Sequence, residues 1–458
     1  MLIHNTQYTI PNTQYLILNT YTQYSKPKNT IKTTINIITL GCPKNIVDSE
    51  RLAAQLVENN FSVYFNRQYP TDVVIINTCG FINDAKVESF ERIIKEIENK
   101  KSGLTKRLYV IGCMIQRYGN NTFRQLSGVD NFFGTEPYKE ILQELGTINK
   151  ISTGREQITL PHYSYLKIAE GCNRHCSFCA IPDIRGKYKS RPIEDLTDEA
   201  RMLAGKGVKE INIIAEDTTY YGLDIYNKQK LVALLDKLVK VDEIEWFRLL
   251  YAYPAGFPDD LIDAIANYPK MCKYIDIPLQ HISDAILKSM NRGINKEKTY
   301  KLIEKLRKQV PGIAIRTSFI TGFPGESEQH FNELLEFIKE MKFDRLGIFK
   351  YSDEDGTPAY RKKKKIPEKL IEERFDILMQ AQQRISLLNN RAKEGKILKT
   401  IIDYKKDNNF FGRTMYDAPE IDNAVIIKSS SGKNIEPGKF YDVKITGSSE
   451  YDLIGSVL

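Results

Sequence analysis

Short runs of aliphatic and β-branched residues alternate with helical segments along most of this 458-residue chain. Val/Ile-rich runs of this kind, placed between helices, are typical of parallel strands in βαβ units. The sequence therefore predicts an α/β protein built on parallel sheets. A chain of this length can form two or three domains, each with its own core.

The first series of strands and helices predicts an N-terminal α/β domain over residues 34–150. Its predicted strands are 35–40, 73–76 and 108–111, and its predicted helices are 45–59, 84–100 and 116–126. Residues 145–160 show neither pattern, and we expect them to link this domain to the next.

A second series covers residues 158–389 and repeats the strand–helix unit six times, with helices predicted at 231–239 and 331–341 among others. Six repeats indicate a partial (β/α)6 barrel rather than the closed eight-stranded form. Residues 367–396 read as a long helix that leaves this domain. The predicted strands are 165–169, 210–214, 246–251, 274–278, 313–319 and 345–351.

The two ends of the chain differ from the middle. Residues 390–458 alternate strands with Gly and Asn turns, which predicts a small all-β barrel. Residues 1–33 carry Asn-Thr pairs at a seven-residue period and almost no charge. No aliphatic residues occupy two seam positions per repeat, so a coiled coil is excluded. We interpret this segment as a disordered or spurious extension and assign it no function.

The chain has seven cysteines, an odd number, and its N-terminus lacks the pattern of a secretory signal. We therefore expect a cytoplasmic protein without membrane contact, in which thiols stay reduced. Metal ligation or redox chemistry then explains the cysteines better than disulfides. The net charge of +8 would suit a nucleic-acid partner, but for this length it is modest and indicates no function by itself.

Cys172, Cys176 and Cys179 form a C-x₃-C-x₂-C loop directly after the first predicted strand of the partial barrel. Three thiolates at this spacing can bind three irons of a 4Fe–4S cluster and leave the fourth iron open to a small molecule. Such barrels place their chemistry at the carboxyl ends of the strands. A zinc site is the alternative, with His175 as a fourth ligand that has little room to complete a tetrahedron.

Cys42, Cys79 and Cys113 are far apart in the sequence, but each ends an apolar strand run. The ends of parallel strands meet at one edge of a sheet, where α/β proteins bind ligands. A single such cysteine could be explained as a small hydrophobic side chain buried in the core. Three cysteines at equivalent positions, each at the end of a strand, favour a metal site. Cys272 has no such partner, and we predict a buried structural thiol.

The loop at Cys172 resembles the signature of the radical S-adenosylmethionine (SAM) superfamily. The resemblance implies that SAM binds the open iron and is cleaved to a 5′-deoxyadenosyl radical. It places Phe178, which precedes the last cysteine, near the adenine. The segment 317–326, with Gly322, resembles the fifth-strand motif that borders the adenosine.

Further positions are candidates for SAM or substrate contacts. Glu216 stands where relatives are expected to carry Gln. Arg316 could bind a carboxylate or pair with a neighbouring helix, and the basic residues Arg185, Lys187 and Arg191 could hold a carboxylate or form an exposed turn. We find no Ser-His-Asp set and no phosphate-binding Gly loop, so no side chain is assigned as catalytic.

Two cysteine sets in this order, followed by a small TRAM-like β-barrel, resemble the methylthiotransferases from about residue 34 to the C-terminus. The resemblance implies a second 4Fe–4S cluster on Cys42, Cys79 and Cys113 that carries the sulfur to be inserted. It also implies a second SAM as methyl donor, an electron donor and a sulfur donor.

Two branches of this family compete. One modifies N6-isopentenyladenosine in tRNA, and the other, the RimO type, modifies an aspartate of small-subunit ribosomal protein S-twelve. The motifs at 39–50, 181–191, 217–222, 417–422 and 450–455 are similar to the RimO type. Residues 391–458 hold eleven Lys and Arg against ten Asp and Glu, and this near-neutral barrel favours a protein partner over RNA.

The basic run 361–365 is the exception, and it is either a solvated loop or a contact with ribosomal RNA during docking. A third hypothesis, from another class, is a cluster-carrying electron-transfer protein that does not turn over SAM.

Overall fold

The computed structural model describes residues 32–68, 70–147, 150–428 and 434–458. The chain divides into two compact units, one ending at Leu160 and one spanning Pro161–Leu458. The predicted N-terminal extension lies outside the described residues except at its last two positions. In the described part of the chain, none of the helices combines the length and the apolar character needed to cross a membrane.

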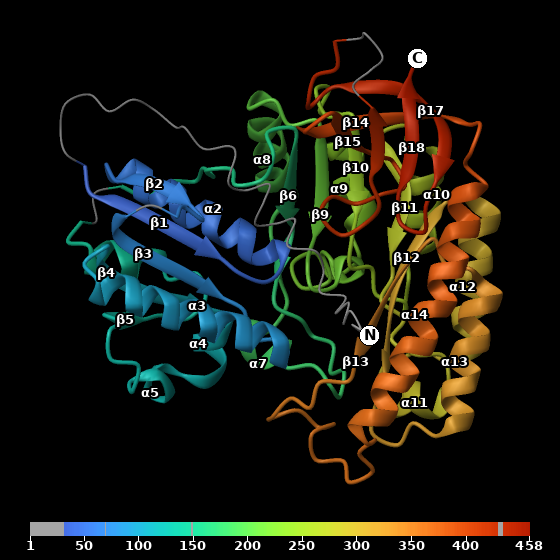
Figure 1. The fold of residues 1–458 in the computed structure, drawn as a ribbon, viewed down its shortest axis with the longest axis horizontal. Helices are drawn as coiled ribbons and strands as arrows, with labels where there is room; N and C mark the ends of the chain where they lie inside the picture. The colour runs from blue at the N-terminus through green and yellow to red at the C-terminus, as the bar shows by residue number, and fades with distance from the viewer. Residues whose placement is uncertain (1–31, 69, 148–149, 429–433) are drawn as a thin grey trace, which may run out of the picture. The chain divides into compact units, whose positions relative to one another are not determined.

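The N-terminal unit is a five-stranded parallel sheet with helices on both faces (Figure 1). The strand order is β2-β1-β3-β4-β5. The strands are β1 (Thr34–Thr39), β2 (Ser62–Phe65), β3 (Thr71–Thr78), β4 (Thr105–Gly112) and β5 (Asn131–Phe132). The helices are α2 (Pro43–Glu58), α3 (Asn83–Lys101), α4 (Cys113–Tyr118), α5 (Asn120–Phe123) and α6 (Tyr138–Glu144).

The three predicted strands of this unit are confirmed, and they form the adjacent strands β1, β3 and β4. The predicted single helix over 116–126 is wrong. Two short helices, α4 and α5, occupy that region because Gly119 between them adopts a φ of +75°, which an α-helix does not allow. The short strands β2 and β5 were missed.

Residues 150–160 of the predicted linker pack on the N-terminal unit. Arg155 is 2% exposed and its guanidinium forms an ion pair with the fully buried Glu50 carboxylate. The backbone N–H of Ile158 donates a 2.7 Å hydrogen bond to the same carboxylate. Pairing of both charges makes burial of this segment possible.

The second unit contains an open sheet of six parallel strands in the order β13-β12-β11-β10-β9-β6. This confirms the predicted partial barrel, and each predicted strand overlaps an observed one. The strands are β6 (Tyr163–Lys167), β9 (Glu210–Ile214), β10 (Trp246–Leu249), β11 (Met271–Asp276), β12 (Ala314–Thr321) and β13 (Arg345–Lys350).

Helices cover the outer face of this sheet (Figure 1). After β6, the short strands β7 (Ala169–Glu170) and β8 (Lys189–Ser190) pair in antiparallel fashion on either side of the cysteine loop. The long helix predicted over 367–396 forms as α14, but it packs on α13 and β13 of this domain instead of leaving it. The helices are α7 (Ile181–Arg185), α8 (Ile193–Gly205), α9 (Leu231–Leu238), α10 (Asp259–Asn267), α11 (Asp284–Ser289), α12 (Lys296–Gln309), α13 (Glu328–Met341) and α14 (Glu368–Arg391).

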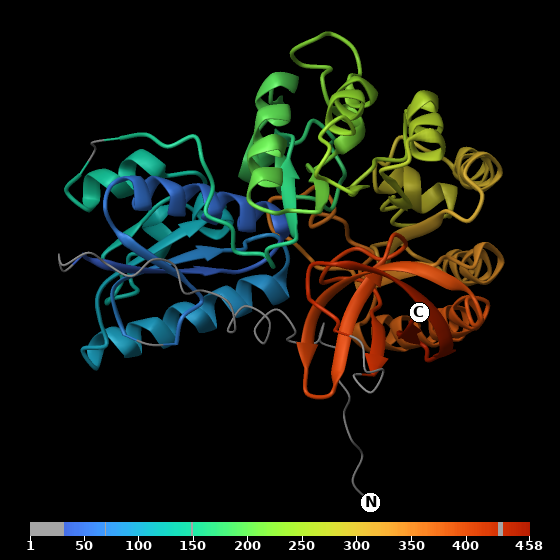
Figure 2. The same ribbon diagram turned by 90° about the horizontal axis from the view of Figure 1, so that it is seen from above.

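The C-terminal residues form the predicted small β-barrel, closed in the order β14-β15-β16-β18-β17 (Figure 2). Alternate side chains such as Ile402, Val443 and Ile445 fill its interior. The strands are β14 (Ile397–Lys406), β15 (Asn409–Thr414), β16 (Val425–Lys428), β17 (Phe440–Ser448) and β18 (Leu453–Val457).

Buried ion pairs attach this barrel to the amino ends of the parallel strands. Arg413 of β15 is 4% exposed, and its guanidinium lies 2.7 Å from both the Glu210 carboxylate on β9 and the Asp403 carboxylate on β14. Burial alone would raise the pKa of Asp403, but Arg413 and a contact with His162 hold that pKa at about 2. Arg345 pairs with Asp417 in the same way.

We expect Arg413→Met to lower the free energy of unfolding by about 3–5 kcal/mol, because two buried carboxylates would lose their shared cation. The single tryptophan, Trp246, lies 4.7 Å from the Phe440 ring of the barrel, so its fluorescence during urea unfolding reports on this contact. Arg201→Met is the control, because its pair with Asp198 is exposed. A change within about 0.5 kcal/mol is expected there, and an equally small change for Arg413→Met would contradict the argument.

Candidate metal centres

The Cys172 loop lies where the sequence predicts it, between β7 and α7 beyond the carboxyl end of β6. Cys172 and Cys176 are each 8% exposed. Burial raises the pKa of Cys172 to about 12, and burial together with the neighbouring Cys176 raises the pKa of Cys179 further. A bound cation would reverse this shift and hold the thiols as thiolates. The donor set therefore fits a metal group better than three thiols without one.

The spacing of the sulfur atoms bears on the choice between a cluster and a single zinc ion. In the described part of the chain, no three of the cysteine sulfur atoms lie within 4.8 Å of one another. Ligands of one tetrahedral zinc at bond lengths of 2.3 Å would have sulfurs about 3.8 Å apart. The side chain of His175, the proposed fourth zinc ligand, belongs to an exposed residue. A cluster does not require such close sulfur atoms, because each thiolate binds a different iron.

The three N-terminal cysteines follow the adjacent strands β1, β3 and β4 of the sheet. Cys42 precedes α2 after β1, Cys79 follows β3, and Cys113 begins α4 after β4. Two glycines allow the close approach of these strand ends. A Cβ atom on Gly41 would lie 2.7 Å from the Cys79 Cβ, and one on Gly80 would lie 2.6 Å from the Met114 Cα.

Sequence reasoning missed Asn45, which ties these three loops together. Its side-chain amide donates to the carbonyl oxygens of Leu40 (2.8 Å) and Thr78 (3.2 Å), at the ends of β1 and β3. Its Oδ1 accepts from the Cys113 thiol at 3.7 Å. Asn45 is fully buried, and only its position three residues after Cys42 could have suggested this role.

Comparison with known proteins identifies all three folded regions. Residues 34–134 match a model described as uncharacterized protein family UPF0004, 166–338 match the radical SAM superfamily, and 395–458 match the TRAM domain. The ribosomal protein uS12 methylthiotransferase RimO of Christiangramia forsetii is 46% identical over 94% of this chain and 96% of its own length. The protein of the same name from Cytophaga hutchinsonii is 47% identical over 94% of this chain and its full length.

The chain belongs to the RimO methylthiotransferase family. The predicted family and branch are thereby confirmed, together with the three-part fold. The radical SAM match implies a 4Fe–4S cluster and SAM as cofactors. Among solved structures, the radical SAM methyltransferase TsrM from Kitasatospora setae has a TM-score of 0.53 over 77% of this chain and 89% of its own. At 13% identity, this likeness shows the fold alone.

Two of the SAM-contact candidates of this RimO-family chain lie at the carboxyl ends of the strands. Phe178 packs against an apolar cluster that includes Met290 and Phe323. Gly322 follows β12, and its N–H donates a 3.0 Å hydrogen bond to the buried Glu326 carboxylate. Their roles toward SAM remain predictions.

Glu216 and Arg316 both contact charged side chains of the chain. The Glu216 carboxylate, after β9, lies 4.0 Å from the Arg185 guanidinium, which also pairs with Glu170 at 2.7 Å. Arg316 contacts the carboxylates of Asp276 and Asp422, each at 3.3 Å.

Of the other two basic residues after the cluster loop, Arg191 pairs with Glu199 at 2.6 Å and Lys187 is exposed. Cys272 is fully buried, as predicted, and burial raises its pKa to about 12.

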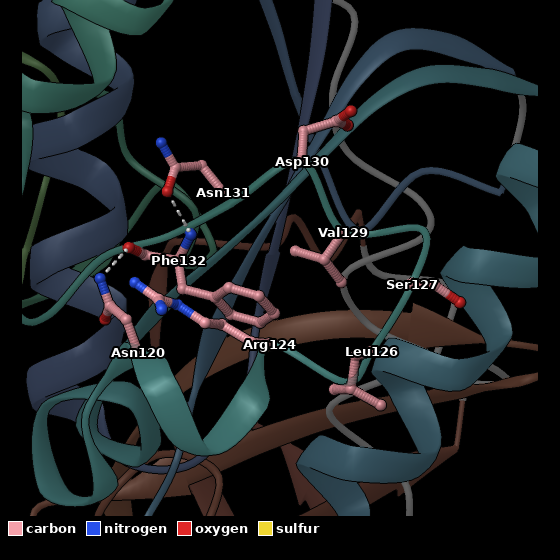
Figure 3. A pocket seen from close by; sticks show the side chains of 8 residues that line it. All are labelled: Asn120, Arg124, Leu126, Ser127, Val129, Asp130, Asn131 and Phe132. Carbon is pink, nitrogen blue, oxygen red and sulfur yellow. Dashed lines mark hydrogen bonds between the residues drawn. The ribbon is translucent and has the colours of Figure 1, made fainter.

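A pocket of about 320 Å³ lies elsewhere in the N-terminal unit, between α5 and β5 (Figure 3). None of the predicted site residues lines it. The Asn120 side chain spans it to the Phe132 carbonyl oxygen at 2.9 Å. The lining residues are Asn120, Arg124, Leu126, Ser127, Val129, Asp130, Asn131 and Phe132.

We expect Gly80→Ala to reduce the iron bound after anaerobic reconstitution by up to half, because the new methyl group would push the Cys113 loop away from Cys79. Iron and sulfide analysis per chain measures this. Gly205→Ala is the control, since a Cβ atom there meets no neighbour within 4 Å. Unchanged iron in Gly80→Ala would show that the close approach of the loops is not needed for metal binding.

Proposed function

We propose that this protein adds a methylthio group to the β-carbon of an aspartate on ribosomal protein uS12, the S-twelve protein of the small subunit. The observation that carries the proposal is the near full-length identity of 44–47% to several proteins named ribosomal protein uS12 methylthiotransferase RimO. The two convergent cysteine sets supply the ligands that this chemistry requires.

We assign the radical SAM cluster to Cys172, Cys176 and Cys179, and a second 4Fe–4S cluster to Cys42, Cys79 and Cys113. When bound, the first cluster supplies, with SAM, the radical that activates a carbon–hydrogen bond, and the second carries the sulfur. The chain's own contribution is positional. Burial of Cys79, Cys113, Cys172 and Cys176 would keep water from the irons, and Asn45 and the glycines hold the second set together.

We assign one role to each domain. Residues 34–150 carry out sulfur insertion, residues 158–389 form the radical, and residues 390–458 bind the substrate. An external electron donor and a sulfur donor complete the reaction. Residues 1–33 take no part in it. All of this chemistry is expected in the cytoplasm, where thiols stay reduced and ribosomes are made.

Alanine at Cys42, Cys79 and Cys113 together is expected to leave about four irons per chain and to preserve 5′-deoxyadenosine formation with dithionite and SAM. Methylthio transfer should be lost, because the sulfur carrier is absent. Alanine at Cys172, Cys176 and Cys179 should instead abolish 5′-deoxyadenosine. Absence of 5′-deoxyadenosine from the unaltered, fully loaded protein would favour the electron-transfer hypothesis.

The second candidate function is methylthiolation of N6-isopentenyladenosine in tRNA. The near-neutral charge of residues 391–458 opposes it, because a barrel that grips RNA should present a basic face. The basic run 361–365, after β13, is exposed at most positions, and Lys365 pairs with Asp353. Docking on the ribosome, next to RNA, would use the remaining charges of this run.

Deletion of the gene is expected to remove one methylthio group, about 46 Da, from uS12 and to leave the modified nucleosides of bulk tRNA unchanged. Mass spectrometry of both fractions measures this in one strain, and expression of the intact chain should restore the mass of uS12. Loss of a tRNA methylthio group with unchanged uS12 would replace the proposed substrate by tRNA.

A further inference from the structure

A four-residue segment, Ser289–Arg292, is bonded along the cysteine loop of the radical SAM domain. The backbone N–H of Ser177 donates to the Met290 carbonyl oxygen at 2.9 Å, and the Ser177 hydroxyl donates to the Ser289 carbonyl oxygen at 2.8 Å. The Asn291 amide donates to the carbonyl oxygen of His175 at 2.7 Å. This segment therefore fixes the loop that carries the predicted cluster ligands.

The last residue of the segment reaches a ligand directly. The Arg292 Nη1 donates a 3.1 Å hydrogen bond to the Cys176 sulfur. The guanidinium is 4.3 Å from the centre of the Tyr253 ring, and the Tyr253 hydroxyl donates to the Arg292 carbonyl oxygen at 2.7 Å. Arg292 is only 4% exposed. Its position is thus set by contacts on several sides.

The charge of Arg292 has no carboxylate partner among the ion pairs of the described residues. Its Nη2 donates to the Pro278 carbonyl oxygen, and its buried Nε donates to no acceptor within the described chain. A buried donor without an acceptor is costly. This arrangement fits an anionic, non-protein acceptor beside Cys176.

We propose that Arg292 is a positioning and redox-tuning residue that stabilises the reduced state of the cluster on Cys172, Cys176 and Cys179. The inference rests on the cluster assignment in the proposed function. A cluster held by three thiolates is anionic, and uptake of one electron from an external reductant makes it more negative. A fixed guanidinium that donates to a ligand sulfur stabilises the reduced form more than the oxidised form, and so raises the potential.

The neighbouring Arg174 does not meet the same conditions. Its guanidinium lies 4.2 Å from the same Tyr253 ring, but it is paired with the buried Asp217 carboxylate at 2.8 Å. The charge of Arg174 is therefore neutralised locally. Only Arg292 combines an uncompensated charge with a hydrogen bond to a ligand sulfur in this part of the described structure.

The test is a redox titration of the full-length chain with Cys42, Cys79 and Cys113 replaced by alanine, so that one cluster remains. Electron paramagnetic resonance of the reduced cluster is followed against ambient potential, without SAM or substrate. We expect Arg292→Met to lower the reduced-to-oxidised ratio about tenfold at the parent midpoint, equal to a shift of about 59 mV for one electron. Arg292→Lys, which keeps the charge, should recover at least half of this shift.

Arg248→Met is the matched control, because Arg248 is fully buried but pairs with Glu210 at the amino ends of the strands. The cluster of this variant should have the same midpoint potential as the cluster of the parent. A fully loaded Arg292→Met with the parent potential overturns the inference. If that variant does not load with iron, equal potentials of Arg292→Lys and Arg292→Gln overturn it. Because no substrate is present, failure of methylthio transfer would refute the proposed function without changing this result.

Discussion

Parallel strand pairing is the constraint on which the placement of both cysteine sets depends. In the N-terminal unit, β1, β3 and β4 are neighbours, and their registers place Thr39 beside Asn77 and Thr78 beside Gly112. The turns that leave these strands must therefore begin at the same edge. Side chains 34 or more residues apart in sequence meet there. The loops that follow these strands also approach each other closely, because Gly41 and Gly80 have no Cβ atom that would separate them.

The carboxyl and amino ends of the strands in the six-stranded sheet carry different kinds of interaction. The carboxyl ends hold a loop of thiols and the glycine turn after β12. The amino ends hold the C-terminal barrel through Arg413, Arg345 and their carboxylate partners. Buried ion pairs add little net stability over apolar contacts, but they are geometrically demanding. They therefore fix the barrel in one orientation on the sheet.

Polar side chains around the thiols appear in both centres. Asn45 contacts Cys113 and also holds two strand ends, whereas Arg292 contacts Cys176 and also holds the cysteine loop through its segment. Groups of this kind orient metal ligands and adjust the charge around them. One cysteine set lies beside a neutral amide and the other beside a cation. The two proposed clusters would therefore have different electrostatic environments within the same chain.

The sequence alone determined the α/β class, the strand count of the partial barrel and the C-terminal barrel, and it proposed the six cysteines as ligands. These follow from local periodicity and from short motifs, which depend only on neighbouring residues. The tertiary structure decided the rest. Asn45 contacts Cys113 and Arg292 contacts Cys176 from distant positions in the sequence. The partners of Arg316 come from β11 and the C-terminal region, and Gly119 divides a predicted helix. Such contacts join residues distant in sequence, and no local pattern encodes which of them will meet.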